Sequence, residues 1–297
     1  MAMAVDAQQK KKAAKAMLKY ATGKHWDPSD CPDWKPQDYS MSCLSRTILK
    51  DPPPGIVVIP DKSDMTQLHA LITGPDDTPY EGGIFRFFIR CPPNYPIHPP
   101  RVKLLTTGNG VVRFNPNLYS NGKVCLSILG TWEGPGWVAS MGLASLLISI
   151  QSLLNDEPLH NEPGLEKESL SPIGRPEVEK YNAYLVHETL RVAVCDTVEM
   201  CLAGSLNLEI QEVVYEYFMN MFDHYVATAE KNKCKDGQLL ENFLVACGMC
   251  MKKTDKFNFA SLRLRLNSLK SQILARGLCQ EPSTASCLNL MEYYIHV

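Results

Sequence analysis

The sequence predicts an α+β fold in which an antiparallel meander of strands precedes a series of helices. Three observations lead to this prediction. Residues 66–105 contain segments in which apolar and polar residues alternate, the pattern of strands with one buried face. A proline-rich and irregular stretch then ends the strands. From residue 143 onward, apolar residues recur at helical spacing, so the second half of the chain is expected to be mostly helical.

The first 37 residues are predicted to be an N-terminal extension. A basic helix is expected over 10–20, and prolines interrupt 26–36. The lysines at 10–12 are expected to form a solvated face, with a nuclear-import patch as the alternative. A short helix is then expected over 39–50, and the prolines at 52–54 end it, because proline lacks a backbone N–H and clashes with the preceding turn.

Strands are predicted over 66–73, 84–91 and 101–105. In the second of them, phenylalanine and isoleucine alternate with arginine. Gly-Pro and Gly-Gly pairs within residues 73–83 mark the hairpin that joins the first two strands. The alternation therefore predicts a meander with one buried face.

The strands are followed by irregular segments and then by helices. Prolines exclude a helix or a central strand at 91–100, and 114–135 has no sustained period, which is typical of a functional loop. Helices are predicted over 143–154 and from Pro176, which suits a first helical turn. Two further helical stripes are expected near the C-terminus, made of Ile210, Val213, Tyr217, Met221 and Tyr225, and of Leu262, Leu266, Leu269 and Ile273.

Composition narrows the class of protein. A formal net charge of −2 and a pI near 6.4 argue against a general nucleic-acid binder. The longest apolar stretch, 141–150, is shorter than the ~18 residues of a membrane helix, and no secretory signal is expected. Eleven cysteines without regular spacing predict reduced thiols in a cytoplasmic and nuclear protein. Cys247 and Cys250 have a metal-ligand spacing without a second pair, so we expect a core helix there and no metal.

Residues 114–126 contain the candidate chemistry. Cys125 follows Asn117 by eight residues, across a turn that Asn121 and Gly122 signal. A thiolate is a nucleophile, and an asparagine amide can donate to the oxyanion that forms when a thioester carbonyl is attacked. A single cysteine is commonly a small buried apolar residue. This one follows an irregular loop instead of lying on an apolar stripe, which favours the nucleophile.

The chain resembles the ubiquitin-conjugating enzyme family over residues 39–201. The shared motifs occur in the family's order: Asp51-Pro52-Pro53, Pro79-Tyr80-Glu81-Gly82-Gly83, Pro93-Asn94-Tyr95-Pro96, Pro99-Pro100, Asn115-Pro116-Asn117, Asn121-Gly122, Cys125-Leu126 and Trp132. The resemblance implies the family's fold, a four-stranded antiparallel meander flanked by helices. A glycine- and tryptophan-containing insert and a helical C-terminal extension resemble the Z-type branch. The implied division is 1–37, 38–203 and 204–297.

The resemblance implies a role for each matching residue. Cys125 would accept the modifier's C-terminal carboxyl from an activating enzyme and pass it to a substrate lysine or to a ligase. Asn117 would support either the oxyanion or the loop that carries Cys125. Asn115, Pro116 and Tyr119 would support that loop, with Asn115 standing where the family usually has histidine. The activating enzyme consumes the ATP, so no cofactor is implied for this chain.

A second loop would receive the lysine. The family usually places an acidic or small polar residue there, and the matching segment is 155–162. Asn161 falls at the acidic position and His160 precedes it. Because asparagine cannot accept a proton from an ammonium group, His160 or water would do so. The alternative is that His160 only caps or lines the loop.

Partner proteins would bind two loops and the first helix. Ile97 replaces the usual aromatic residue of the first ligase-binding loop, and Trp132 lies in the second unless it packs inward. On the helix, basic residues are common in the family. The matching positions here are Tyr39, Ser40 and Cys43, and only Arg46 and Lys50 remain basic.

Loss of these charges predicts weak recognition by the standard ubiquitin-activating enzyme. The non-standard activating enzyme, ubiquitin and the ubiquitin-like modifier FAT-ten are the partners that the Z-type resemblance implies. Two rival functions are a non-catalytic module, which would lack the cysteine, and a thiol peptidase, which would need a histidine positioned to activate Cys125.

Overall fold

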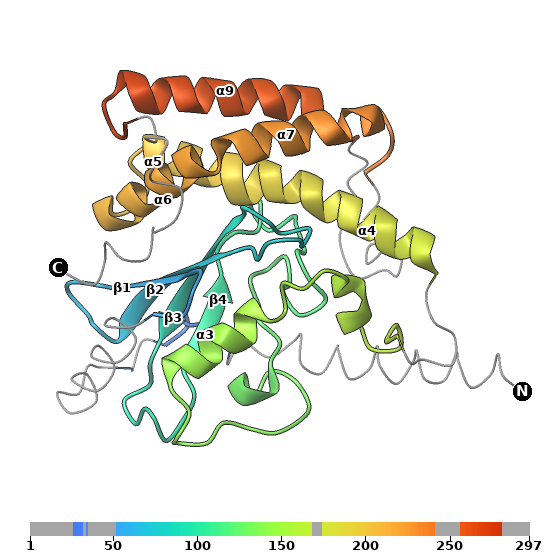
Figure 1. Cartoon of the computed structure of the whole chain (residues 1–297). Coiled ribbons are helices and arrows are strands. Elements are labelled where there is room, and N and C mark those ends of the chain that lie inside the picture. The colour runs from blue at the N-terminus through green and yellow to red at the C-terminus, as the bar shows by residue number, and fades with distance from the viewer. Residues whose placement is uncertain (1–25, 32–33, 35–51, 168–173, 241–255, 281–297) are drawn as a thin grey trace, which may run out of the picture.

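The computed structural model describes residues 26–31, 34, 52–167, 174–240 and 256–280. Its centre is a four-stranded antiparallel sheet whose strands pair in chain order (Figure 1). The strands are β1 (Ile56–Pro60), β2 (Gln67–Thr73), β3 (Ile84–Arg90) and β4 (Arg101–Leu104). The predicted fold, a four-stranded antiparallel meander flanked by helices, is confirmed.

Three of the strands match the alternation of the sequence to within one residue at an end. The first strand, β1, was not predicted by alternation. Residues 56–59 are four consecutive β-branched residues, the pattern of a strand that is buried on both faces. Ile56 and Val58 lie in the core on one face, and Ile59 lies in a second core on the other.

Helix α3 (Leu143–Gln151) covers one face of the sheet. Its residues Leu146, Leu147 and Ile150 have no exposed surface, and they join the alternating apolar residues of all four strands in one cluster. The helix was expected to reach residue 154 but ends at Gln151, and a turn follows. Helix α4 (Arg175–Glu188) adds Tyr181 to the same cluster.

The opposite face of the sheet is also covered, so the expectation of one buried face is wrong. Ile59, Leu71 and Ile84 form a second cluster with helices that lie on the other side of the sheet from α3 (Figure 1). The physical reason is that the C-terminal segment brings its own apolar faces to the sheet. These helices are α5 (Thr197–Leu202), α6 (Leu208–Asn220), α7 (Phe222–Asn232) and α9 (Phe259–Ala275).

The predicted helical stripes place these helices correctly. All four residues of the second stripe are buried in α9. The first stripe spans two helices, because α6 ends at Asn220 and α7 begins at Phe222. Helix α4 continues through the π-helical segment η3 (Thr189–Asp196) into α5, so the catalytic and C-terminal parts share one cluster. The division at residues 203 and 204 stays a prediction.

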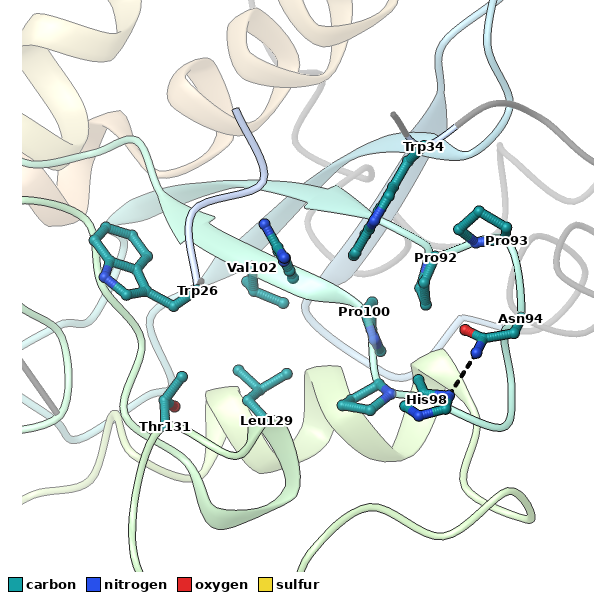
Figure 2. Close-up of a pocket in the computed structure, with 12 residues that line it drawn as sticks. Trp26, Trp34, Pro92, Pro93, Asn94, His98, Pro100, Val102, Leu129 and Thr131 are labelled. Atoms are coloured by element: carbon teal, nitrogen blue, oxygen red, sulfur yellow. Dashed lines mark hydrogen bonds between the residues drawn. The ribbon is translucent and has the colours of Figure 1, made fainter. Parts of the chain in front are cut away.

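A segment that precedes the sheet, made of residues 26–31 and 34, packs against the side chains of Arg101 and Lys103 in β4. Lys103 Nζ lies 2.7 Å from Asp27 Oδ2, and the Arg101 guanidinium lies 4.6 Å from the centre of the Trp34 ring. Between this segment and the proline-rich loop is a cavity of about 470 Å³, with Trp26 and Trp34 on one side (Figure 2). The helices expected over 10–20 and 39–50, and the pair Cys247 and Cys250, lie outside the described residues.

The covered face predicts a measurable contribution from Tyr225. This fully buried tyrosine donates a hydrogen bond of 2.7 Å to the Gly82 carbonyl in the hairpin between β2 and β3. Tyr225→Phe leaves that carbonyl unsatisfied and should lower the free energy of unfolding by about 1–2 kcal/mol, measured by urea denaturation. Tyr181→Phe is the matched control, since Tyr181 is fully buried in α4 and its hydroxyl has no hydrogen-bond partner among the described residues. Equal losses in the two variants would contradict a role for this bond.

Candidate active site

The loop that carries Cys125 is held by hydrogen bonds between its own two sides. The Cys125 N–H donates to the Asn117 carbonyl at 2.8 Å, and Asn117 Nδ2 donates to the Cys125 carbonyl at 2.9 Å. Leu118 and Val124 pair beside them as an antiparallel bridge. The eight-residue spacing therefore brings Asn117 and Cys125 directly opposite each other.

The predicted turn at Asn121 and Gly122 closes this loop. Asn121 Oδ1 accepts a hydrogen bond of 3.0 Å from the Lys123 N–H. Gly122 has a φ of 90°, and a Cβ there would lie 2.5 Å from the Leu104 carbonyl oxygen. Glycine is the residue that tolerates both constraints, so the Asn-Gly pair is explained by the backbone.

Asn115 joins the loop to two other parts of the molecule. Its side chain is fully buried, and its Oδ1 accepts from the Asn117 N–H at 2.9 Å. Its Nδ2 donates to the Leu153 carbonyl at 2.7 Å and to the Tyr80 hydroxyl at 3.1 Å, and that hydroxyl donates to the Phe114 carbonyl at 2.7 Å. An asparagine in the usual histidine position thus makes local hydrogen bonds that hold the loop.

The Cys125 side chain has no exposed surface. Burial raises the pKa of the thiol, whereas the charge of Lys123, a hydrogen bond from Tyr119 and the charge of Arg113 lower it. The charge of Glu162 raises it further, and the net result is a pKa above that of an ordinary thiol. The sulfur is therefore mainly protonated at neutral pH in this conformation, although three groups around it favour the thiolate.

Tyr119 packs against Arg113 and acts on the thiol. Its ring lies 4.3 Å from the Arg113 guanidinium carbon, and its hydroxyl lowers the pKa of Cys125. Burial raises the pKa of the Tyr119 hydroxyl, so it keeps its proton and acts as the donor. The loop residues Asn115, Pro116 and Tyr119 all lie around the Cys125 loop, as their predicted supporting role requires.

Two charged residues near the thiol were missed by the sequence reasoning. Arg113 and Glu162 form an ion pair of 3.4 Å whose side chains are 3% and 5% exposed. Burial raises the pKa of Glu162 to about 7, Arg113 opposes this rise and Glu166 adds to it. The signals available in the sequence were an arginine among apolar neighbours and a glutamate directly after Asn161.

Residues 38–186 match the family model described as "Ubiquitin-conjugating enzyme". The chain belongs to the ubiquitin-conjugating enzyme family. It is 46% identical to human "Ubiquitin-conjugating enzyme E2 Z" over 85% of this chain and 70% of that protein. The same protein of Xenopus tropicalis is 47% identical over 85% and 79% of the two chains. The solved structure of human ubiquitin-conjugating enzyme E2 G1 is 31% identical, with a TM-score of 0.35, over 40% of this chain and 98% of that chain.

These relatives show a conjugating enzyme of the Z type. The residues predicted to receive the lysine, Asn161 and His160, hold their own loop, the gate loop of residues 155–162. Asn161 Nδ2 donates to the Leu153 carbonyl at 3.3 Å, the same oxygen that Asn115 uses. His160 Nδ1 lies 2.7 Å from the Leu165 carbonyl, which can only accept, so this nitrogen carries the hydrogen. These contacts correspond to the loop-lining alternative for His160, and its part in proton transfer stays a prediction.

The predicted ligase-binding loops of this conjugating enzyme touch each other. Ile97 is 68% exposed, whereas Trp132 is half-buried. Trp137, which was not predicted to act, donates from Nε1 to the Pro96 carbonyl at 2.7 Å and lies against Tyr95. The insert is thereby fastened to the proline-rich loop. The helix positions Tyr39, Ser40, Cys43 and Arg46 lie outside the described residues.

The described part of this conjugating enzyme offers neither a metal-binding cluster nor a membrane-spanning helix. Within these residues, no group of three or more histidine, cysteine, aspartate and glutamate side chains is arranged to hold a metal ion. None of the helices in the same residues has the length and apolar character that crossing a membrane requires.

The buried carboxyl of Glu162 predicts a pH-dependent stability. Its pKa in the folded protein, about 7, lies above the ordinary value of 4.5, so its stabilising contribution is complete below pH 4.5 and is lost as the pH rises through 7. The loss is on the order of 3 kcal/mol. Glu162→Gln cannot titrate, so the fall in stability from about pH 5 to about pH 8 should be smaller than in the wild type. Urea denaturation at both pH values tests this.

The exposed Glu133 provides the control, because Glu133→Gln should retain the wild-type difference between the two pH values. An unchanged difference in Glu162→Gln would show that Glu162 titrates in the folded protein as an ordinary carboxyl.

Proposed function

We propose that this conjugating enzyme accepts ubiquitin, or a ubiquitin-like modifier, as a thioester on Cys125 and transfers it to a substrate lysine or to a ligase. The observation that carries the proposal is the pairing of Cys125 with Asn117 across a closed turn. Cys125 has a thiol that can act as a nucleophile, and Asn117 has an amide that can donate to an oxyanion; the pairing holds both in one hydrogen-bonded loop. The match to the family supports the same reaction.

The reaction is two acyl transfers. In the first, the Cys125 thiolate attacks the carbonyl of the modifier's thioester on the activating enzyme, and that enzyme's thiol leaves. In the second, a lysine amine attacks the new thioester, an amide forms and the Cys125 thiol is released. Because the acyl group arrives already activated, we propose that this chain uses no cofactor. The lysine's proton passes to His160 or to water.

The buried thiol sets a condition on loading. Since Cys125 has no exposed surface, a side chain or the loop has to move before an acyl group reaches the sulfur. Tyr119, which is only partly buried, is one of the groups that lower the pKa of this thiol. We infer that Tyr119 is displaced when the modifier is loaded.

Asn117 has two possible roles, and the structure bears on both. Its amide donates to the Cys125 carbonyl, which is a loop-supporting bond. To donate to an oxyanion, the same amide has to leave that carbonyl. We propose that Asn117 supports the loop before the reaction and turns to the oxyanion during transfer.

The finer assignments of partner and location are proposals as well. We propose the non-standard activating enzyme as the donor, because Tyr39, Ser40 and Cys43 supply no positive charge where basic residues are common. We propose FAT-ten as a second modifier, because the resemblance to the Z-type branch implies it. Ile97 would contact a ligase. The described cysteines form no disulfides, which supports the cytoplasm and nucleus.

The two rival functions have less support. A non-catalytic module has no use for a cysteine held opposite an oxyanion donor. A thiol peptidase would need a histidine to activate Cys125, and His160, the local candidate, uses its Nδ1 to donate to the Leu165 carbonyl instead.

The first prediction concerns the identity of the acceptor. Incubation with activating enzyme, ATP and modifier should give a reducible adduct on the wild type, an oxyester that resists reduction on Cys125→Ser, and no adduct on Cys125→Ala. A hydroxyl accepts the acyl group but gives a less reactive ester, which explains the difference. A panel of both activating enzymes, with ubiquitin and FAT-ten, is read on non-reducing gels.

Cys234→Ser is the matched control, because Cys234 is exposed and should be dispensable. A reducible adduct that persists on Cys125→Ala would assign the reaction to another cysteine. Cleavage of a peptide by the wild type would support the peptidase.

A second prediction separates loading from discharge. Asn117→Ala should still be loaded at Cys125 but should discharge to free lysine roughly 10²–10³ times more slowly, the usual effect of losing one oxyanion donor. Single-turnover discharge of purified thioester measures the step. Unchanged discharge would leave Asn117 with a structural role alone, and equal losses in both steps would indicate that the loop itself is displaced.

A further inference from the structure

Arg113 is a buried cation in direct contact with the Cys125 loop. Its side chain packs against that loop, and only 3% of the side-chain surface is exposed. Its Nη2 donates to the Pro116 carbonyl, in the Asn-Pro-Asn turn. The guanidinium therefore reaches the loop backbone at the residue directly before Asn117.

The same guanidinium reaches two more segments. The Tyr119 ring lies 4.3 Å from the guanidinium carbon, and the hydroxyl of that tyrosine lowers the pKa of the Cys125 thiol. Glu162, which comes from the gate loop 49 residues away, lies 3.4 Å from Nη2. One side chain thus contacts the turn, Tyr119 and the gate loop.

Packing alone does not explain an arginine at this position. Taking a guanidinium out of water is costly, and a buried ion pair is often replaceable by apolar residues without loss of stability. The neighbours Val112 and Phe114 are buried and apolar, so a leucine at position 113 would suit this segment of the chain. Arginine has a planar face that packs on Tyr119 and a positive charge that pairs with Glu162. Neither lysine nor leucine has both features.

We propose that Arg113 is a positioning residue that sets the reactivity of the Cys125 thiol, by holding the Tyr119 ring beside the Cys125 loop and by offsetting the negative charge of Glu162. The inference rests on the proposed function, in which Cys125 carries the modifier. Direct electrostatics act in the same direction, because the Arg113 charge lowers the pKa of Cys125 and the Glu162 charge raises it.

The groups that face the thiol come from more than one element. Lys123 and Tyr119 lie on its own loop, Arg113 precedes that loop, and Glu162 follows the short helix η2 (Pro158–Asn161). Changes at Arg113 are therefore measured against changes at Glu162 and Tyr119, with Lys123 constant.

The test is the rate at which iodoacetamide alkylates Cys125 in the full-length protein, followed over a pH series by mass spectrometry of the Cys125 peptide. The exposed Cys234 is an internal reference in every sample. Arg113→Met retains a long side chain without the charge. It should move the midpoint of the Cys125 profile to higher pH and slow alkylation at neutral pH roughly threefold to tenfold, since only the thiolate reacts.

Companion variants separate charge from geometry. Glu162→Gln should move the midpoint in the opposite direction, to lower pH. Arg113→Lys should move the midpoint to higher pH by less than Arg113→Met does, because lysine keeps the positive charge but lacks the planar face. In a Tyr119→Phe background, Arg113→Met should have a smaller effect than in the wild type, since part of its action passes through Tyr119.

A merely structural role predicts a different result. Loosening of the loop would change alkylation by the same factor at every pH and leave the midpoint in place, which would overturn the inference. If Arg113→Met does not fold, the double variant Arg113→Met/Glu162→Gln leaves no lone buried charge. Its midpoint should lie above that of Glu162→Gln alone, and equal midpoints would overturn the inference.

Loading assays separate this inference from the proposed function. Single-turnover loading of Arg113→Met at neutral pH should slow by a factor similar to that of alkylation. If the wild type is not charged at Cys125, the proposed function fails. If it is charged there and the midpoint of Arg113→Met equals that of the wild type, only the role of Arg113 fails.

Discussion

The carbonyl of Leu153 fixes both loops that flank the thiol. It lies just beyond α3 and accepts one hydrogen bond from Asn115 in the Cys125 loop and another from Asn161 in the gate loop. Because α3 is packed on the central sheet, this oxygen connects both loops to the main hydrophobic core. The arrangement depends on asparagine, whose amide donates to Leu153 while the Asn115 side-chain oxygen serves the loop itself.

Reactivity at Cys125 results from opposing influences within a small volume. Burial protects the thiol and keeps it protonated, and the Tyr119 hydrogen bond and the nearby cations favour the thiolate. Glu162 adds a carboxyl whose pKa, about 7, lies close to physiological pH. A thiol in such surroundings responds to small displacements, because each neighbour acts at short range in a medium that water does not screen.

The sequence predicted those parts of the fold and of the site that are determined by local patterns of residues close together in the chain. Alternation identified three strands, an Asn-Gly pair identified the turn before Cys125, and two helical stripes identified the C-terminal helices. The first strand escaped because a run of β-branched residues does not alternate when both its faces are buried. The pair of Arg113 with Glu162 escaped because its members are 49 residues apart, and only tertiary packing brings them together. Trp137 escaped for the same reason, since its partner Pro96 is 41 residues away.

The sheet face opposite α3 is covered by the C-terminal helices, and this has a consequence for synthesis of the protein. The strands carry Ile59, Leu71 and Ile84 on that face, and their cover comes from helices that lie far later in the chain. The hydrogen bond from Tyr225 to Gly82, for instance, spans 143 residues. On a ribosome, the meander emerges and pairs long before α6, α7 and α9 exist, so an apolar surface is open to other chains during that interval. The nascent meander is therefore the stage at which chaperone binding is of most use to this protein.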